Sequence, residues 1–324
     1  MASNKIVSLK EAISVIQDGD IVSYGGIIDG RRPVAAMREV AKQRKKNLIA
    51  LSFLAVEDLL VGAGCIKAIR GCYTHLGVFG KAPCIHRALE NHELVVDEIG
   101  HIDAQLQLMA PALGLPYVAS PYCIGSDIIH PDYDYSEKLR SIARHPDKIG
   151  KKKYIFTENP FSEEHETVVL VPAIKPDVAI IHVGQVGAEG TVRIEGTQGL
   201  DVYAAFAADK VIVTAEEIVP ESYVRRDPNR NSIPTTQVDM IVHVPWGAHP
   251  TALPGYYDMD MEALFAYQKA AKTAEGFEKW ANEWIYCPSD HNEYLEKIGV
   301  PKMQQLTAVK PFGFKPRTSI EQLG

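Results

Sequence analysis

Short apolar runs alternate with helical patterns along most of this 324-residue chain. The first helix is signalled by Ser8 and Glu11. They form a capping box, in which the side chain of each residue can accept a hydrogen bond from the free backbone N–H of the other. Apolar positions at helical spacing follow, and Asp18-Gly19 is expected to end this helix.

A strand and a second helix come next. The strand is predicted over residues 21–24, the pair Gly25-Gly26 breaks it, and Pro33 suits the first turn of a helix that runs to about Lys42. This order of strand, glycine-rich turn and helix predicts a βα unit.

Further apolar runs predict more strands. They carry little alternation, which is typical of parallel strands that are covered on both faces. The runs are 48–51, 116–119, 168–171, 178–183, 211–215 and 240–244. Strands spaced by helices predict an α/β fold with a doubly wound, mostly parallel sheet flanked by helices. In such folds ligands bind beyond the carboxyl ends of the strands.

Two segments are less regular. Residues 127–167 are rich in Asp, Lys, Pro and Tyr and are expected to form a surface excursion or lid. We therefore expect an α/β domain over 1–252 that includes this excursion. Residues 253–324 are expected to be a C-terminal helical extension packed on the same domain, with one helical stretch from Met261 to Trp284.

Composition narrows the function classes. With 34 Lys and Arg against 41 Asp and Glu the net charge is −7, which argues against binding to nucleic acid. No apolar run approaches the roughly 20 residues that span a bilayer, and no signal peptide is evident, so we expect a cytoplasmic protein without a membrane partner. The five cysteines form no C-x-x-C pair, so we expect reduced, mostly buried thiols and no metal site.

The turn from Gly25 to Pro33 is a candidate binding loop. Adjacent glycines let a backbone approach a ligand closely, the next helix can offer N–H groups to an anion, and Arg31 and Arg32 add cations. The spacing fits neither a dinucleotide-binding fingerprint nor a P-loop. The alternative is a tight turn with two surface arginines.

Histidines supply other candidates. His101 stands beside a glycine at a helix start, where it could act as acid, base or oxyanion donor, although a solvated helix-start histidine is the simpler interpretation. His75 is weighed in the same way. His182 and His243 fall in apolar strands and are interpreted as core histidines, and Glu216-Glu217 as structural or interfacial.

Together these segments resemble the A (alpha) subunit of glutaconate CoA-transferase and its relatives in the class I CoA-transferase superfamily. The resemblance covers nearly the whole chain. It rests on residues 8–20, Gly25-Gly26 through Arg31-Arg32-Pro33, Cys72-Tyr73-Thr74, Ala112-Leu113-Gly114-Leu115-Pro116, 177–182, 190–194, Arg225-Arg226-Asp227-Pro228, Gly247-Ala248-His249-Pro250 and 290–295.

The resemblance implies an active site where an A and a B subunit meet, in a heterodimer that assembles into a heterotetramer or larger. A glutamate of the B subunit attacks the acyl-CoA thioester and later carries CoA itself, so no nucleophile is expected in this chain. Coenzyme A is expected as the acyl-CoA substrate, with a carboxylic acid as second substrate and no permanently bound cofactor. The A subunit is expected to bind substrate through Gly25, Gly26, Arg31, Arg32, Phe53, Thr74, His75 and Leu76.

Two departures from the family pattern bear on the reaction. The A subunit's polar oxyanion donor is usually a glutamine, and His101 stands there here; unlike a glutamine it can also move protons. The segments around Phe53 and around His75-Leu76 are bulkier than in the family, which predicts a more apolar acyl pocket. Two alternatives therefore remain: decarboxylation or C–C hydrolysis of a CoA thioester with His101 as acid/base, or a non-catalytic CoA-ester-binding subunit.

Overall fold

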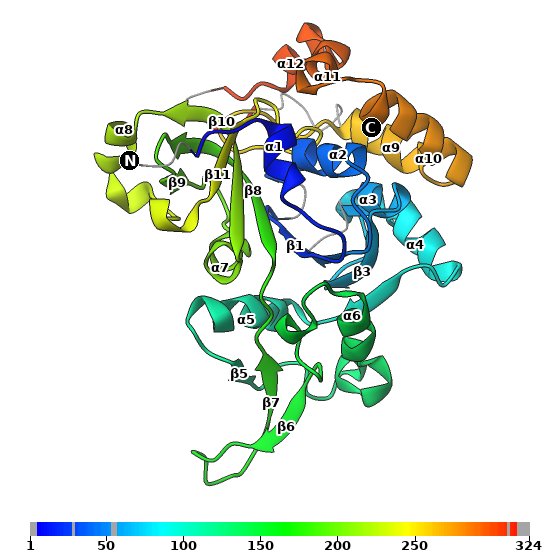
Figure 1. Ribbon diagram of the computed structural model, residues 1–324, viewed down its shortest axis with the longest axis vertical. Helices are drawn as coiled ribbons and strands as arrows, with labels where there is room; N and C mark the ends of the chain where they lie inside the picture. The colour runs from blue at the N-terminus through cyan, green and yellow to red at the C-terminus, as the bar shows by residue number, and fades with distance from the viewer. Residues whose placement is uncertain (1–4, 28–29, 53–56, 310–311, 316–324) are drawn as a thin grey trace.

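The structure, a computed structural model, describes residues 5–27, 30–52, 57–309 and 312–315. Its centre is an eight-stranded sheet in the order β11-β10-β8-β1-β2-β3-β4, with β9 paired to β8 alone (Figure 1). All neighbours in this order are parallel, and β9 is antiparallel. The strands are β1 (Ile21–Tyr24), β2 (Leu48–Ser52), β3 (Ile66–Gly71), β4 (Val95–Glu98), β8 (Val178–Gly187), β9 (Val192–Arg193), β10 (Lys210–Val219) and β11 (Met240–His243).

Helices cover both faces of this sheet. One core joins alternate strand residues such as Val22 to helices α1–α4, α9 and α10, and the other joins Ile21 and its equivalents to α5–α7. The helices are α1 (Leu9–Ser14), α2 (Val34–Lys42), α3 (Asp58–Gly62), α4 (Pro83–Glu90), α5 (His101–Ala112), α6 (Ser136–Ile142), α7 (Asp201–Ala207), α8 (Glu221–Arg225), α9 (Met261–Ala270), α10 (Ala274–Ala281), α11 (His291–Ile298) and α12 (Val300–Leu306). The doubly wound α/β prediction is confirmed.

Two of the predicted parallel strands belong to another sheet. Residues 116–119 and 168–171 fall in β5 (Tyr117–Ser120) and β7 (Thr167–Pro172), which with β6 (Ile155–Glu158) form a separate three-stranded antiparallel sheet. The assignment to the parallel sheet was wrong because these two strands are more buried on one side than on the other, as antiparallel sheets allow. This small sheet projects at the opposite end of the molecule from α11 and α12 (Figure 1).

Strands β3 and β4 escaped the sequence prediction. Both belong to the central sheet, but each carries a buried charge: Arg70 on β3 stands opposite Asp97 on β4. The Arg70 Nε donates to Asp97 Oδ2 at 2.8 Å, and Lys153 Nζ lies 3.1 Å from the other oxygen. Because these charges are paired across strands, they can be buried. They also interrupt the apolar runs of β3 and β4, so a prediction based on apolar runs does not find these two strands.

Two helices are shorter than predicted. Helix α1 ends at Ser14 rather than at Asp18-Gly19. The stretch from Met261 to Trp284 is broken, since Thr273 caps a new helix, its hydroxyl accepting from Gly276 N–H at 3.0 Å. The extension packs α9 and α10 onto the core beside α2 and α3. No helix within the described ranges is long and apolar enough to cross a membrane.

Candidate functional site

The predicted site residues emerge at the carboxyl edge of the central sheet. Gly25-Gly26 follow β1, residues 74–76 follow β3, and His101 follows β4 and begins α5. Two strands separate β1 from β4, so at about 4.8 Å per spacing their ends are about 14 Å apart. A ligand that contacts both the glycine turn and His101 must therefore be long, and it would also pass the loop after β3, which lies between them.

The Gly25-Gly26 turn is packed too tightly for a side chain. Gly26 has φ +86°, and a Cβ added there would lie 2.5 Å from the Gly30 carbonyl oxygen. The Gly26 N–H donates to Asp201 Oδ1 at 2.8 Å, and the Gly25 N–H donates to the Ile180 carbonyl at 2.8 Å. Both N–H groups are thus used within the chain, so they are not available to bind an anion. A role of the two glycines toward substrate stays a prediction.

Arg31 and Arg32 are buried, so the interpretation as surface arginines was wrong. They are 1% and 0% exposed, and their guanidinium groups form ion pairs with Asp201 and Glu57 respectively. Arg31 also donates to the Thr197 carbonyl. As the structure stands, the two arginines brace the glycine turn between α7 and the segment before α3. Their role toward substrate stays a prediction.

Gly26→Ala tests this packing. The variant combines an unfavourable φ with a backbone clash, and we expect a loss of unfolding free energy of about 2 to 3 kcal/mol in denaturant titrations. Gly64→Ala is the matched control, because Gly64 also has positive φ (+71°) but an added Cβ meets nothing within 4 Å. Equal losses for the two variants would contradict a tightly packed turn.

The loop after β3 and the start of α5 lie side by side. The His101 ring centroid is 5.1 Å from that of Tyr73, and both side chains are exposed. The Thr74 carbonyl accepts from Ala82 N–H at 3.2 Å, while His75 is exposed and Leu76 is buried in the core. Phe53, the remaining predicted contact, lies outside the described residues. His101 and its neighbours therefore form an accessible surface at the sheet edge.

The start of α5 is anchored by a buried carboxylate that the sequence analysis did not identify. Asp103 is fully buried and accepts from Tyr154 at 3.0 Å and Ser120 at 3.3 Å. A Cβ on Gly100 would lie 2.4 Å from the Cys123 sulfur, so the residue before His101 must be small. These contacts fix the backbone from which His101 projects.

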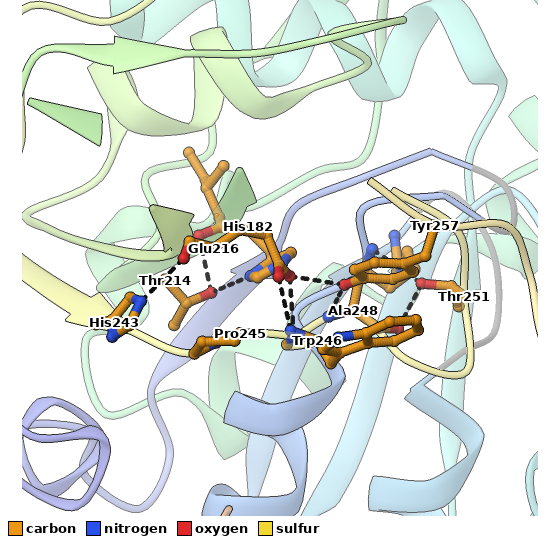
Figure 2. Close-up of polar contacts among 12 residues, drawn as sticks. His182, Thr214, Glu216, His243, Pro245, Trp246, Ala248, Thr251 and Tyr257 are labelled. Carbon is orange, nitrogen blue, oxygen red and sulfur yellow. Dashed lines mark hydrogen bonds and ion pairs between the residues drawn. The ribbon is translucent and has the colours of Figure 1, made fainter. Parts of the chain in front are cut away.

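A second missed feature is a hydrogen-bond network centred on Glu216 (Figure 2). His182 is fully buried; its Nε2 lies 3.0 Å from Glu216 Oε1 and its Nδ1 lies 2.9 Å from Thr214 Oγ1. An ionised carboxylate only accepts, so the proton is on Nε2. Tyr257 Oη also donates to Oε1 at 2.8 Å, and Trp246 N–H donates to Oε2 at 2.7 Å. The interpretations of His182 as a core histidine and of Glu216 as structural agree with this geometry. The interpretation of His243 as a core histidine was wrong, because this last residue of β11 is exposed.

The Glu216 network supports the glycine turn through the loop after β11. Glu216 also accepts the Gly247 N–H at 3.2 Å, and the Gly247 carbonyl in turn accepts the Ala35 N–H at 2.9 Å. Further along the loop, the Ala252 carbonyl accepts the Arg31 N–H at 2.7 Å. The buried Glu216 carboxylate thus positions the glycine turn indirectly, through the loop after β11.

Four side chains near the turn and His101 could in principle be nucleophiles, but their surroundings do not favour this role: Glu57, Glu216, Cys72 and Cys123. Glu57 is ion-paired with Arg32, and Glu216 is enclosed by its four donors. Burial raises the pKa of the Cys72 thiol to about 12 and that of Cys123 to about 11, so both are protonated at neutral pH. Within the described ranges, no group of three His, Cys, Asp or Glu side chains is placed to hold a metal ion.

Comparison with known proteins identifies the family to which the chain belongs. Residues 6–244 match the family described as Coenzyme A transferase. The A subunit of glutaconate CoA-transferase from Acidaminococcus fermentans is 36% identical over 315 residues, which are 96% of this chain and 97% of that protein. The A subunit of 3-oxoadipate CoA-transferase from Pseudomonas knackmussii is 31% identical over 92% of this chain and 99% of that protein.

Solved structures agree. The crystal structure of the Acidaminococcus fermentans glutaconate coenzyme A-transferase superposes with a TM-score of 0.90 at 35% identity, covering 97% of this chain and 98% of that one. The decarboxylase AibA/AibB superposes with a TM-score of 0.71 at 29% identity, covering 87% of this chain and all of the other. This chain therefore belongs to the coenzyme A transferase family.

Proposed function

We propose that this chain is the A subunit of a two-chain acyl-CoA:carboxylate CoA-transferase whose nucleophilic glutamate lies on the B subunit. The observation that carries the proposal is the near full-length similarity to two proteins named as CoA-transferase A subunits. The engaged state of Glu57 and Glu216 supports a nucleophile from another chain. The B subunit in a heterodimer or larger assembly, and the cytoplasmic location, are predictions that accompany it.

The proposed reaction has two halves. The B-subunit glutamate attacks the thioester carbonyl, which gives an acyl-glutamyl anhydride and CoA thiolate; the thiolate then attacks the glutamyl carbonyl, giving a glutamyl-CoA thioester and the free acid. The second acid reverses these steps. Each attack places negative charge on a carbonyl oxygen, which needs a hydrogen-bond donor. Exposed His101 is the proposed donor in this chain, and the glycine turn is proposed to lie beside the bound thioester.

The test is to purify the chain with its B subunit and to measure both the new acyl-CoA and any free CoA that the complex produces. Transfer predicts one new acyl-CoA for each acyl-CoA consumed, only with both chains and an acceptor acid present. Release of free CoA without any acceptor acid would contradict transfer. The predicted apolar acyl pocket adds that larger apolar acids should be better acceptors than glutaconate, and equal efficiency would overturn that part.

His101→Gln and His101→Ala distinguish a donor from an acid/base. As an oxyanion donor, His101 is replaceable by glutamine with a loss of turnover of only about threefold, whereas alanine costs about 100-fold or more. Steady-state transfer assays on the two variants measure this, with Tyr73→Phe as the control that leaves His101 in place. Equal, large losses for both His101 variants would favour proton transfer.

A decarboxylase is the second candidate function. The structural similarity to the decarboxylase AibA/AibB, together with an exposed histidine at the sheet edge, favours it over a non-catalytic subunit. It predicts that CO2 is released from an acyl-CoA while the thioester stays intact. A carbon-dioxide assay on the A/B complex therefore separates it from transfer.

A further inference from the structure

A cavity lies between α2 and the C-terminal helices. Its volume is about 90 Å³, and most of its lining is aliphatic or aromatic. The apolar walls include Leu59, Leu76, Phe79, Leu264 and Trp280. One charged side chain, Arg38 of α2, also lines it.

Arg38 is buried without a carboxylate partner. It is 6% exposed; its guanidinium lies 3.4 Å over the Tyr294 ring, NH1 is 3.5 Å from the His249 carbonyl, and NH2 is 3.3 Å from His291 Nδ1. In the described part of the chain no carboxylate oxygen lies within 4.0 Å of it. Arg70, by contrast, is buried against Asp97. A buried charge without a counter-ion is costly.

The groups around Arg38 do not supply the missing charge. His291 accepts from Arg38 at Nδ1 while its Nε2–H donates to the Pro245 carbonyl at 2.6 Å, so its ring is neutral. Burial and the Arg38 charge lower the pKa of His291 to about 4. Nearby acids have other partners: Asp260 is bonded to His249 Nε2 at 3.2 Å, Glu39 accepts from Gln43 Nε2 at 2.7 Å, and Asp290 accepts the Glu293 N–H at 3.0 Å.

We propose that this cavity binds a short apolar monocarboxylate, with the carboxylate against Arg38 and the hydrocarbon body in the cavity. A carboxylate would complete the charge balance of Arg38, and charge-assisted hydrogen bonds are the strong ones. The volume is below the roughly 150 Å³ of an apolar cavity that holds benzene. It accordingly suits a body of about three or four carbons. The proposal concerns binding alone and holds whether or not the enzyme transfers CoA.

The experiment is isothermal titration of the purified A/B complex with sodium butyrate in the absence of CoA. Butyrate should bind more tightly than acetate, which lacks the body, and than butan-1-ol, which lacks the charge. Arg38→Gln should weaken butyrate binding about tenfold or more, because the charge-assisted hydrogen bonds to the carboxylate are lost. Arg44→Gln is the matched control, because Arg44 is exposed just beyond the end of the same helix, and it should leave binding unchanged.

A second variant covers the case in which Arg38→Gln disturbs folding. Ala263→Leu fills the cavity from α9 and leaves Arg38 in place, so it should also abolish butyrate binding while the melting temperature is retained. Butyrate that binds equally to the wild type and to both variants would overturn the proposal, as would no binding to the wild type. Tighter binding of glutarate than of butyrate would also contradict it, because a second carboxylate would be buried among apolar walls.

Discussion

Asp201→Ala is expected to give the largest combined loss of stability and activity in this chain. The substitution removes the buried partner of Arg31 and the acceptor of the Gly26 N–H. Breaking a buried ion pair by removing one partner costs about 3 to 5 kcal/mol. Because the glycine turn would also shift, we expect CoA transfer to fall by about 100-fold, the effect of displacing a substrate by about 1 Å. Denaturant unfolding and steady-state transfer assays measure the two losses.

Two controls separate the roles of Asp201. Asp209→Ala removes an acid from an exposed ion pair with Lys148 and should cost less than about 1 kcal/mol. The double variant Arg31→Met/Asp201→Leu leaves no unpaired charge, so it should recover stability but not activity. Wild-type activity in Asp201→Ala would show that this ion pair does not position the substrate.

Glu216→Ala is the second substitution with a large expected effect. It leaves four donors without their acceptor in a buried environment: His182 Nε2, Tyr257 Oη and two backbone N–H groups. Loss of a buried hydrogen-bond network of this kind is expected to cost about 3 to 5 kcal/mol. Glu217→Ala is the control, because Glu217 is exposed and accepts from Gln185 at 2.9 Å. Similar losses for the two neighbours would contradict a central role for Glu216.

The Glu216 network also predicts a pH dependence. Burial by itself would raise the pKa of Glu216, but hydrogen bonds and the interaction with His182 hold it below its usual value of 4.5. The folded-state pKa is thus depressed, so this stabilisation is present above about pH 4.5 and is lost as the pH falls through the folded-state pKa. As the pH is lowered from 6 to 3, the unfolding free energy should fall less steeply in Glu216→Gln than in the wild type.

Much of the fold could be predicted because apolar runs mark β1, β8, β10 and β11 directly. Strands β3 and β4 could not, since Arg70 and Asp97 neutralise one another only when the two strands are paired. The strand runs at 116–119 and 168–171 were found but placed in the wrong sheet. An apolar run shows that a strand is buried, and it does not show which strand lies next to it.

The site was predicted only in part, for a related reason. The positions of Gly25-Gly26 and His101 at strand ends follow from the order of elements along the chain. The burial of Arg31 depends on Asp201, which is 170 residues away in sequence, and no local pattern indicates that pair. The Glu216 network did leave a signal: side chains alternate along a strand, so of two adjacent glutamates near the end of β10 one must point inward.

In the proposed mechanism, this chain works with a nucleophile that it does not itself carry. The direct test is to mix the A/B complex with acyl-CoA, reduce any enzyme thioester with borohydride, and locate the modified residue by mass spectrometry. We expect a single reduced glutamate on the B subunit and an unmodified A chain. A modified residue in this chain, Glu57 and Glu216 included, would contradict it, and so would turnover with no modified residue on either chain.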